Sequence, residues 1–333
     1  MSAANNFVSD LYAIAHEQQL DATALLRDAG ISEEVIGDAD IRVERKALAK
    51  FQINIWDALD DEAMGLSDYP IRRGTFHMLG KLAVGERTLR DALVVGADFQ
   101  RVASDAYTVT LTERGDTAEL LFTMSSASHP KYYLLAEITL LAWHRMASWL
   151  IAENVTLKRI YFDYEKPSHF REYEYLLPAD YEFDKGRLGF TFSSALLERK
   201  VCQTRETLES FIAECPEDLY ARPRQDFSLA SAVRRVLRSS MVEGFASIEV
   251  VASELHLSRR SLTRKLESEG TSFQQIKDFL RRDRAVFLLE SRTRSVSEVA
   301  ESIGFSDAAV FARAFKTWTG MSPTQFRSQL SPP

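Results

Sequence analysis

The chain has 333 residues, more than the roughly 100–200 of an ordinary domain, so two domains are expected. Hydrophobic residues make up 45% of the chain and charged residues 27%, values that exclude disordered, collagen-like and fibrous proteins. The net charge of −7 is unevenly spread, because residues 224–333 hold 17 lysines and arginines against 12 aspartates and glutamates. A basic segment joined to an acidic one is typical of a nucleic-acid-binding module attached to a second domain.

The first two thirds of the chain predict an α+β domain. Apolar residues recur at helical spacing through residues 1–65, as Phe7 and Leu11 illustrate. A long apolar helix is expected over residues 132–152. Alternating apolar and polar residues, with a turn at Gly115 between the first two runs, predict β-strands. These strands are expected at residues 107–112, 118–123, 157–164, 181–183 and 188–192.

The apolar helix over residues 132–152 is expected to be buried in the protein rather than to cross a membrane. Glu137, His144 and Arg145 interrupt it, and ionisable groups are unfavourable inside a bilayer. Residues 1–10 lack the basic start and apolar core of a signal peptide. We therefore expect a cytoplasmic protein that does not associate with membranes.

A domain boundary is expected near residue 222. Pro216 and Pro223 interrupt a polar stretch, and beyond Phe227 the strand patterns stop. The expected organisation is an α+β domain at residues 1–215, a linker at residues 216–227 and an all-α domain at residues 228–330.

The all-α segment repeats one pattern. Each copy has a first helix with four inward-facing apolar residues, a short turn and a second helix. The inward-facing residues are Ile248, Val251, Ala252 and Leu255 in the first copy, and Val296, Val299, Ala300 and Ile303 in the second. Each turn has a serine placed to cap the second helix, Ser258 or Ser306, and Gly304 suits a left-handed backbone. The pattern predicts two helix-turn-helix units.

The second helix of each copy has an apolar inner face and a basic outer face. Its inward residues are Leu262 and Leu266 in the first copy, and Phe311, Phe315 and Trp318 in the second. Its outward residues are Arg259, Arg260, Ser261, Thr263 and Arg264 in the first copy, and Arg313 and Lys316 in the second. In helix-turn-helix proteins this helix enters the DNA major groove, where arginine pairs with guanine or holds a phosphate. Double-stranded DNA is therefore the expected partner.

An amphipathic run at residues 273–290 separates the two copies. A helix of this length spans about 27 Å, and successive major-groove faces lie roughly 34 Å apart. One monomer therefore has the reach to read two adjacent turns of the duplex. We expect Arg281, Arg282 and Arg284 on this helix to have structural roles or to form ion pairs within the domain rather than to read bases.

The second copy and its tail, residues 303–327, resemble the signature of the AraC/XylS-type transcription regulators. The tail carries Gly320, the pair Ser322-Pro323 and the pair Phe326-Arg327. This resemblance covers residues 228–329. Residues 20–205 resemble, through the run at residues 75–80, the effector-binding and dimerisation domain of a subset named after arabinose binding. That name does not make arabinose the ligand here.

The resemblance implies which positions read bases. They are Arg260, Thr263 and Arg264 in the first recognition helix, and Ala308, Ala309, Ala312 and Arg313 in the second. The alanines are a departure, because alanine can touch a thymine methyl group but cannot hydrogen-bond a base edge. We therefore expect the first helix to do most of the direct reading, and Arg313 and Lys316 to hold phosphates. The resemblance also implies a homodimer and contact with RNA polymerase.

Signals for a small-molecule effector in the first domain come from aromatic residues. Ligand pockets are mostly apolar and aromatic with a few polar groups. The candidates of this kind are Tyr107, Trp143, His144, Phe162, Tyr164 and His169. The alternative for each of them is an ordinary packed core residue.

The sequence predicts no catalytic group, no cofactor and no metal site. The glycines at residues 80 and 85 are followed by Glu86-Arg87, which does not fit a phosphate-binding loop. Cys202 and Cys215 stand apart, which argues against structural zinc and a disulfide scaffold. We therefore do not expect an enzyme; one with a DNA-binding tail would need reactive groups in residues 1–220.

These patterns predict a sequence-specific DNA-binding transcription regulator controlled by a small-molecule effector, and the resemblance implies an activator. The alternative is an effector-independent DNA-binding or interaction protein whose first domain serves only dimerisation. The effector, the operator, the regulated genes and the choice between activation and repression stay open at this point.

Overall fold

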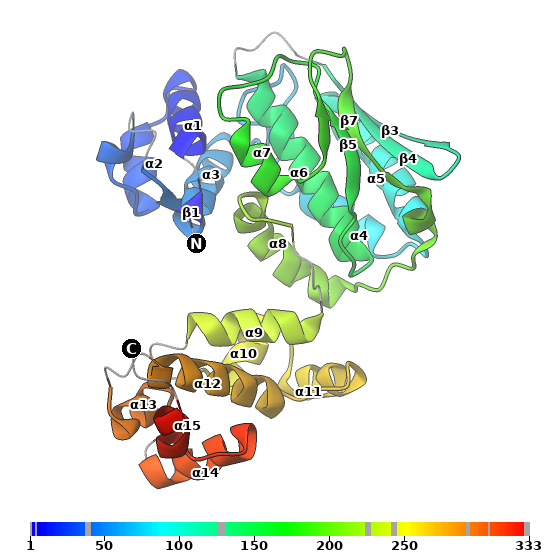
Figure 1. The fold of residues 1–333 in the computed structure, drawn as a ribbon. Coiled ribbons are helices and arrows are strands. Elements are labelled where there is room, and N and C mark those ends of the chain that lie inside the picture. Colours follow the sequence, from blue (N-terminus) through cyan, green and yellow to red (C-terminus); the bar gives the residue numbers. More distant parts are fainter. Residues whose placement is uncertain are drawn as a thin grey trace. The chain divides into compact units, whose positions relative to one another are not determined.

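The computed structural model describes residues 2–3, 5–36, 41–125, 131–223, 228–240, 245–290, 294–305 and 307–329. Its contacts divide the chain into two compact units, Met1–Asp226 and Phe227–Pro333 (Figure 1). The first unit mixes helices with a sheet, and the described part of the second is helical. This is the fold class that the sequence predicts.

The first unit begins with three helices packed together, α1 (Asn5–Glu17), α2 (Ala22–Asp28) and α3 (Arg45–Leu59), and a short 3-10 turn, Glu33–Val35. Their buried apolar faces confirm the helical pattern expected over residues 1–65. The sequence analysis did not find the small antiparallel sheet here, in which β1 (Ser2–Ala3) pairs with β2 (Val43–Glu44). Strands of two residues are too short to show a period of two.

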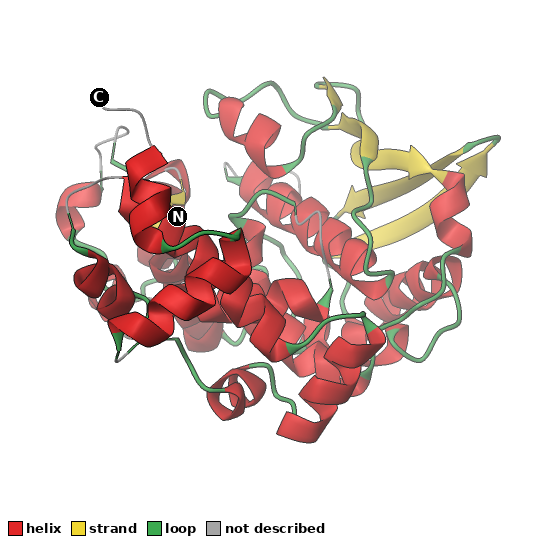
Figure 2. Cartoon of the chain, turned by 60° about the horizontal axis from the view of Figure 1, so that its bottom comes forward, coloured by secondary structure: helices red, strands yellow, loops and turns green. Residues whose placement is uncertain are grey.

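The main sheet of the first unit has five strands, in the order β3-β4-β7-β5-β6. Their bounds are β3 Tyr107–Arg114, β4 Thr117–Met124, β5 Leu157–Tyr161, β6 Asp180–Glu182 and β7 Leu188–Ser193. All neighbours are antiparallel except β5 and β6. Arg114 pairs with Thr117 across a tight turn in which Gly115 takes a φ of 62°, as the predicted hairpin requires. Figure 2 shows helices packed along one side of this sheet.

The remaining helices of this unit are α4 (Thr75–Ala83), α5 (Leu89–Ala103), α6 (Tyr132–Leu150), α7 (Arg171–Leu176) and α8 (Arg205–Leu219), with a 3-10 turn at Ser194–Glu198. Nearly all of α6 is buried, including the three ionisable residues that interrupt its apolar sequence. This confirms the prediction of a buried helix. Among the described residues, no helix is long and apolar enough to cross a membrane.

Helix α8 differs from the sequence expectation, because it passes through Pro216 and ends at Leu219. The first four residues of the expected linker are therefore helical. Proline removes the backbone hydrogen bond to the carbonyl of Ile212. The helix continues because Cys215, Pro216 and Leu219 are buried where α8 packs against α3 and α6, so tertiary packing overrides the local preference. Residues 224–227 of that linker lie outside the described residues.

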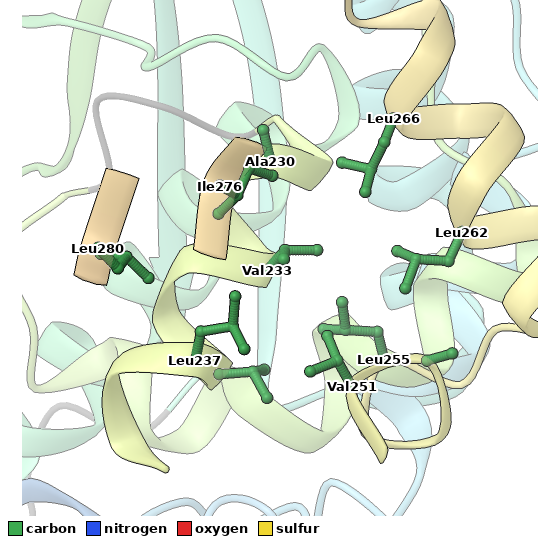
Figure 3. Packing of buried hydrophobic residues seen from close by; sticks show 11 residues of the cluster. Ala230, Val233, Leu237, Val251, Leu255, Leu262, Leu266, Ile276 and Leu280 are labelled. Atoms are coloured by element: carbon green, nitrogen blue, oxygen red, sulfur yellow. The ribbon is translucent and has the colours of Figure 1, made fainter. Parts of the chain in front are cut away.

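The second unit comprises α9 (Leu229–Ser239), α10 (Ile248–Glu254), α11 (Arg259–Ser268), α12 (Phe273–Glu290), α13 (Val296–Ser302), α14 (Ala308–Thr319) and α15 (Pro323–Gln329). It has two hydrophobic cores. Figure 3 shows the first, in which side chains from α9, α10, α11 and α12 converge. The second core is built from α12, α13 and α14. Helix α12 has the bounds predicted for the spacer, and it contributes to both cores.

The caps and backbone conformations at the two turns agree with the predicted helix-turn-helix units, except for the second cap. Ser258 caps α11 by accepting a hydrogen bond from the backbone of Ser261, and Gly304 takes the left-handed backbone with a φ of 79°. His256 takes the same conformation in the first copy. The second cap was placed one residue too early: Asp307 caps α14, accepting from the Val310 amide at 2.8 Å. Ser306 itself lies outside the described residues.

Replacing Phe311 by alanine tests the second core. Phe311 is fully buried among Phe305 and Phe315, whereas its neighbour Val310 is 44% exposed. Phe311→Ala should remove about 3–5 kcal/mol of local stability, and Val310→Ala should change little. Hydrogen exchange of the α13 and α14 amides in the full chain measures this difference. Equal exchange rates in the two variants would contradict the placement of Phe311 in the core.

Candidate nucleic-acid interface and ligand cavity

The first recognition helix, α11, separates its residues cleanly between two faces. Leu262 and Leu266 are fully buried in the first core (Figure 3), while Arg260, Thr263 and Arg264 are exposed. This is the arrangement that the sequence predicted. An exposed face with two arginines and a threonine on a capped helix has the size and chemistry to contact base edges and phosphates in a groove.

The two other polar candidates on α11 have partners within the protein. Arg259 donates to Glu249 of α10 at 2.8 Å, and the Ser258 hydroxyl donates to that of Ser261. Backbone and Ser247 hydrogen bonds, with a smaller contribution from Arg259, lower the pKa of Glu249. The structure gives the side chains of Arg260 and Arg264 no ion pair within the described residues, so their positive charge is available to a ligand.

The second recognition helix, α14, presents a smaller and less polar surface. Ala309, Arg313 and Lys316 are exposed, and Ala308 and Ala312 are half-buried. The opposite face is built from the predicted aromatic residues. Phe311 and Phe315 are fully buried, and Trp318 is half-buried against Phe305, with ring centroids 5.9 Å apart. Two cations beside three small apolar side chains suit phosphate contact and shape recognition better than base pairing.

Arg281 connects the spacer helix α12 to the turn of the second helix-turn-helix. Its guanidinium donates to the backbone carbonyls of Ile303 and Gly304, each at 3.2 Å. It also lies 4.7 Å from the ring of Phe305 and 5.4 Å from that of Phe245, which precedes α10. Burial lowers the pKa of Arg281, but an arginine keeps its charge in proteins. Arg281 therefore ties the turn of the second helix-turn-helix to the residue stretch that precedes the first helix-turn-helix.

The other two spacer arginines also have partners inside the chain. Arg282 pairs with Asp283 at 3.0 Å and lies over the ring of Phe279, and Arg284 has an interaction partner. These contacts agree with the structural role that the sequence analysis gave to the three arginines.

The first unit contains a cavity of about 240 Å³. Its wall comes from α3, α4, α5, β3, α6 and α8, together with the loop that follows α3, and it is mostly apolar. The lining residues are Ile53, Trp56, Glu62, Ile71, Arg73, Thr75, Phe76, His77, Leu79, Gln100, Tyr107, Leu135, Ile138, Thr139, Ala142, Ile212, Ala213, Cys215, Pro216 and Leu219.

Glu62 is the carboxylate in this lining, and its oxygens are already hydrogen-bonded. They accept from the amides of Gly74 and Phe76 at 2.8 and 3.1 Å, and from Arg73 at 3.4 Å. Burial nevertheless raises the pKa of Glu62. Arg73 also binds Asp57 at 2.7 Å, so its charge is balanced by two carboxylates.

Two other polar side chains of the lining carry hydrogen-bond donors with unused capacity, and a third, Tyr107, carries a hydroxyl. Trp56 Nε1 and Gln100 Nε2 are buried and have no hydrogen-bond partner among the described residues. Tyr107 accepts a hydrogen bond from Trp143 Nε1 at 3.1 Å, and burial raises its pKa so that it keeps its own proton. Buried donors without acceptors are uncommon in folded proteins, and each invites an explanation.

Of the six aromatic and histidine candidates, the structure places Tyr107 in the cavity and the other five elsewhere. Trp143 lies behind Tyr107 and supports its hydroxyl. Phe162, Tyr164 and His169 belong to a separate aromatic cluster around Tyr173. Aromatic composition does not predict which residues line this cavity, because cavity lining depends on contacts between distant segments.

The separate cluster is organised by a buried carboxylate, Glu137 of α6. His169 shares a 2.9 Å hydrogen bond with it, and Tyr173 donates to it. Burial raises the pKa of Glu137. Burial of His169 acts in the opposite sense, yet its bond to Glu137 leaves the pKa of His169 raised. These groups join α6 to α7.

His144 and Arg145 of α6 form a third buried polar site. Arg145 donates to the His144 Nδ1 at 2.7 Å, and the ring shares a 2.8 Å bond with the carbonyl of Val155. The imidazole is therefore neutral, with its proton on Nε2. Arg145 also donates to the carbonyls of Leu176, Asp218 and Ala221, so it holds the chain that follows α8.

Metal and redox sites are not found in the described part of the chain. No group of three or more potential metal ligands occurs there, and neither Cys202 nor Cys215 forms a disulfide bond.

Fold and surface together define a helix-turn-helix DNA-binding protein with a second, ligand-sized cavity domain. The family model described as the arabinose-binding domain of AraC transcription regulators matches residues 20–201, and a helix-turn-helix domain model matches residues 251–329. The chain belongs to the AraC family of transcription regulators. It is a regulator and not an enzyme.

Some similar proteins match nearly the whole of this chain and others match about a third of it. The ornithine utilization regulator of Pseudomonas aeruginosa is 27% identical over 97% of this chain and 98% of its own. The transcriptional activator CfaD of Escherichia coli is 31% identical over 33% of this chain and 40% of its own. The crystal structure of the regulator CdpR from P. aeruginosa covers 92% of this chain and 96% of its own, at 20% identity and a TM-score of 0.36.

The neutral state of His144 predicts a dependence of stability on pH. Burial, followed by the nearby charge of Arg145, lowers the pKa of His144 to about 3. Unfolded histidine titrates near 6.5, so below that pH the unfolded state binds a proton that the folded state does not. The first unit should therefore lose about 2 kcal/mol between pH 7 and pH 5 from this residue.

Urea unfolding of the full chain at pH 7, 6 and 5 measures this loss, with His144→Asn and the exposed His16→Asn as the pair of variants. Only His144→Asn should reduce the pH dependence. An unchanged dependence in that variant would contradict a neutral buried imidazole.

Arg281→Ala tests the connection between the spacer helix and the second helix-turn-helix. It removes two charged hydrogen bonds, each worth about 1.5–3 kcal/mol at most, and α13 should exchange its amide hydrogens faster. Arg282→Ala, one residue along the same helix, is the matched control and should leave α13 unchanged. If both variants exchange at the wild-type rate, Arg281 does not hold the turn.

Proposed function

We propose that this regulator binds a specific DNA sequence through its two recognition helices, with α11 as the main reader of bases. The observation that carries the proposal is the exposed pair Arg260 and Arg264, which has no ion pair among the described residues, on a helix whose other face fills a core. Arg260, Thr263 and Arg264 contact base edges. Arg259 and Ser261 orient the start of the helix through their bonds to Glu249 and Ser258.

The second helix contributes position more than sequence. Arg313 and Lys316 hold phosphates, while Ala308, Ala309 and Ala312 allow close approach and touch thymine methyl groups. The 18 residues of α12 span about 27 Å. With both helices held by this spacer, one chain contacts two successive major grooves.

We further propose that a small effector in the cavity controls DNA binding. Helix α8 supplies part of the cavity wall through Ile212, Cys215 and Leu219, and it is the last helix before the DNA-binding unit. A ligand that fits the cavity better in one position of α8 than in another shifts the balance between two states of the protein. Arg145 binds the chain just beyond this helix and so senses its position.

The proposed regulator acts as a homodimer that recruits RNA polymerase and activates transcription. The relative CfaD is named a transcriptional activator, which favours this sense of control. The ornithine in the name of the full-length relative belongs to that protein. The alternative is a domain that only dimerises; the unpaired buried donors of two lining residues, Trp56 and Gln100, favour effector binding instead.

Arg264→Ala tests the assignment of base reading. Loss of a bidentate contact with guanine should weaken binding to an operator, selected from random duplexes, by about 1–3 kcal/mol and random DNA much less. Arg313→Ala, which removes a phosphate contact, should weaken both by similar factors. Fluorescence anisotropy titrations at fixed salt give the affinities of the wild type and of both variants for the operator and for random DNA.

Equal losses on operator and random DNA for Arg264→Ala would make Arg264 a phosphate contact. A larger loss on the operator than on random DNA for Arg313→Ala would make Arg313 a base contact.

A further inference from the structure

Two polar groups of the cavity lining are buried without a partner among the described residues, and both are N–H donors. Trp56 and Gln100 each present a buried N–H group without a partner among the described residues, and their exposed fractions are only 8% and 1%. Tyr107 adds a hydroxyl whose oxygen already accepts from Trp143. All three side chains line the same cavity. A molecule that satisfies them must bring an acceptor atom.

The charges around the cavity disfavour an ionised ligand. Arg73 is the arginine of the lining, and it is already paired with Asp57 and Glu62. A carboxylate ligand would therefore gain little from Arg73 and lose its hydration in an apolar site. An ammonium ligand would face N–H donors, and the oxygens of Glu62 already accept from two amides and an arginine.

The size and apolar wall narrow the ligand further. A cavity of about 150 Å³ holds benzene, so 240 Å³ fits roughly ten non-hydrogen atoms. Arabinose is of about this size, but its hydroxyl protons need acceptors on several sides. The wall offers few acceptors, in Thr75, Thr139 and Gln100, and is otherwise mainly aliphatic, as at Ile53, Ile71, Leu135 and Ile138.

We propose that the cavity takes a compact, uncharged, mainly apolar molecule with one carbonyl oxygen, which Trp56 and Gln100 bind. This deepens the effector role given above and rests on it only for the consequence in DNA binding. The carbonyl oxygen accepts from the indole and carboxamide N–H groups, and Tyr107 belongs to the same lining. The remaining atoms pack against the aliphatic side chains.

A matched pair of probes tests this chemistry on the full-length protein. Acetophenone and cumene have nearly the same shape, but only acetophenone has the acceptor oxygen. Acetophenone should bind at least tenfold more tightly, since one well-placed hydrogen bond in a buried site is worth about that factor. Benzoate, L-arabinose and L-ornithine serve as the charged and sugar probes and should bind more weakly than acetophenone.

The indole N–H resonances of the four tryptophans provide a site-specific readout. Acetophenone should shift the resonance that disappears in Trp56→Phe, and cumene should shift it much less. Gln100→Leu should lower the affinity for acetophenone roughly three- to tenfold and leave that for cumene unchanged. Because this variant removes an unsatisfied buried group, its melting temperature should not fall.

Three results would overturn the proposal: equal affinity for acetophenone and cumene, tighter binding of a charged or sugar probe, or an unshifted Trp56 resonance at saturation. Operator affinity, measured separately with and without acetophenone, tests the regulatory role. If acetophenone shifts Trp56 and operator binding does not change, the cavity chemistry stands and effector control through this site fails. If operator binding is intact and acetophenone binds no better than cumene, only the ligand chemistry fails.

Discussion

The DNA-binding unit depends on one helix that is anchored in two cores. Ile276 and Leu280 of α12 belong to the first core, and Ala285 and Leu289, further along, belong to the second. Arg281 lies between these pairs and binds the turn of the second helix-turn-helix. Because a continuous helix resists bending, neither recognition helix can move far without disturbing a packed core. The separation of the two reading surfaces is thus set by backbone geometry rather than by a flexible connection.

In the first unit, packing and hydrogen bonds likewise restrain the end of α8. One side of α8 forms part of the cavity wall, and the carbonyls of Asp218 and Ala221 accept hydrogen bonds from the buried Arg145. Pro216 leaves one helical hydrogen bond unmade in the same stretch. The cavity, a helix with a weakened turn and a buried arginine therefore meet just before the chain enters the DNA-binding unit. The proposed effector control acts on this stretch of the chain.

Local patterns predicted the parts of the fold that depend on neighbours in sequence. The apolar period of residues 273–290 predicted α12 with its observed bounds, and Gly115 predicted the hairpin turn. Helix α8 passed the proline because of buried contacts that no local pattern shows. The cap at Asp307 was missed because serine and aspartate are both good caps. The cavity could not be predicted, since residues as distant as Trp56, Gln100 and Leu219 form its wall.

Two recognition helices held at a fixed separation are proposed to read one DNA duplex. Selection of bound sequences from random duplexes by the full-length protein, followed by hydroxyl-radical footprinting, tests this reading. We expect one enriched sequence with protection of the backbone flanking two successive major grooves on one face, and loss of specific affinity when about five base pairs, half a turn, are inserted between them. No enrichment over competitor DNA at physiological ionic strength, or indifference to the insertion, would contradict it.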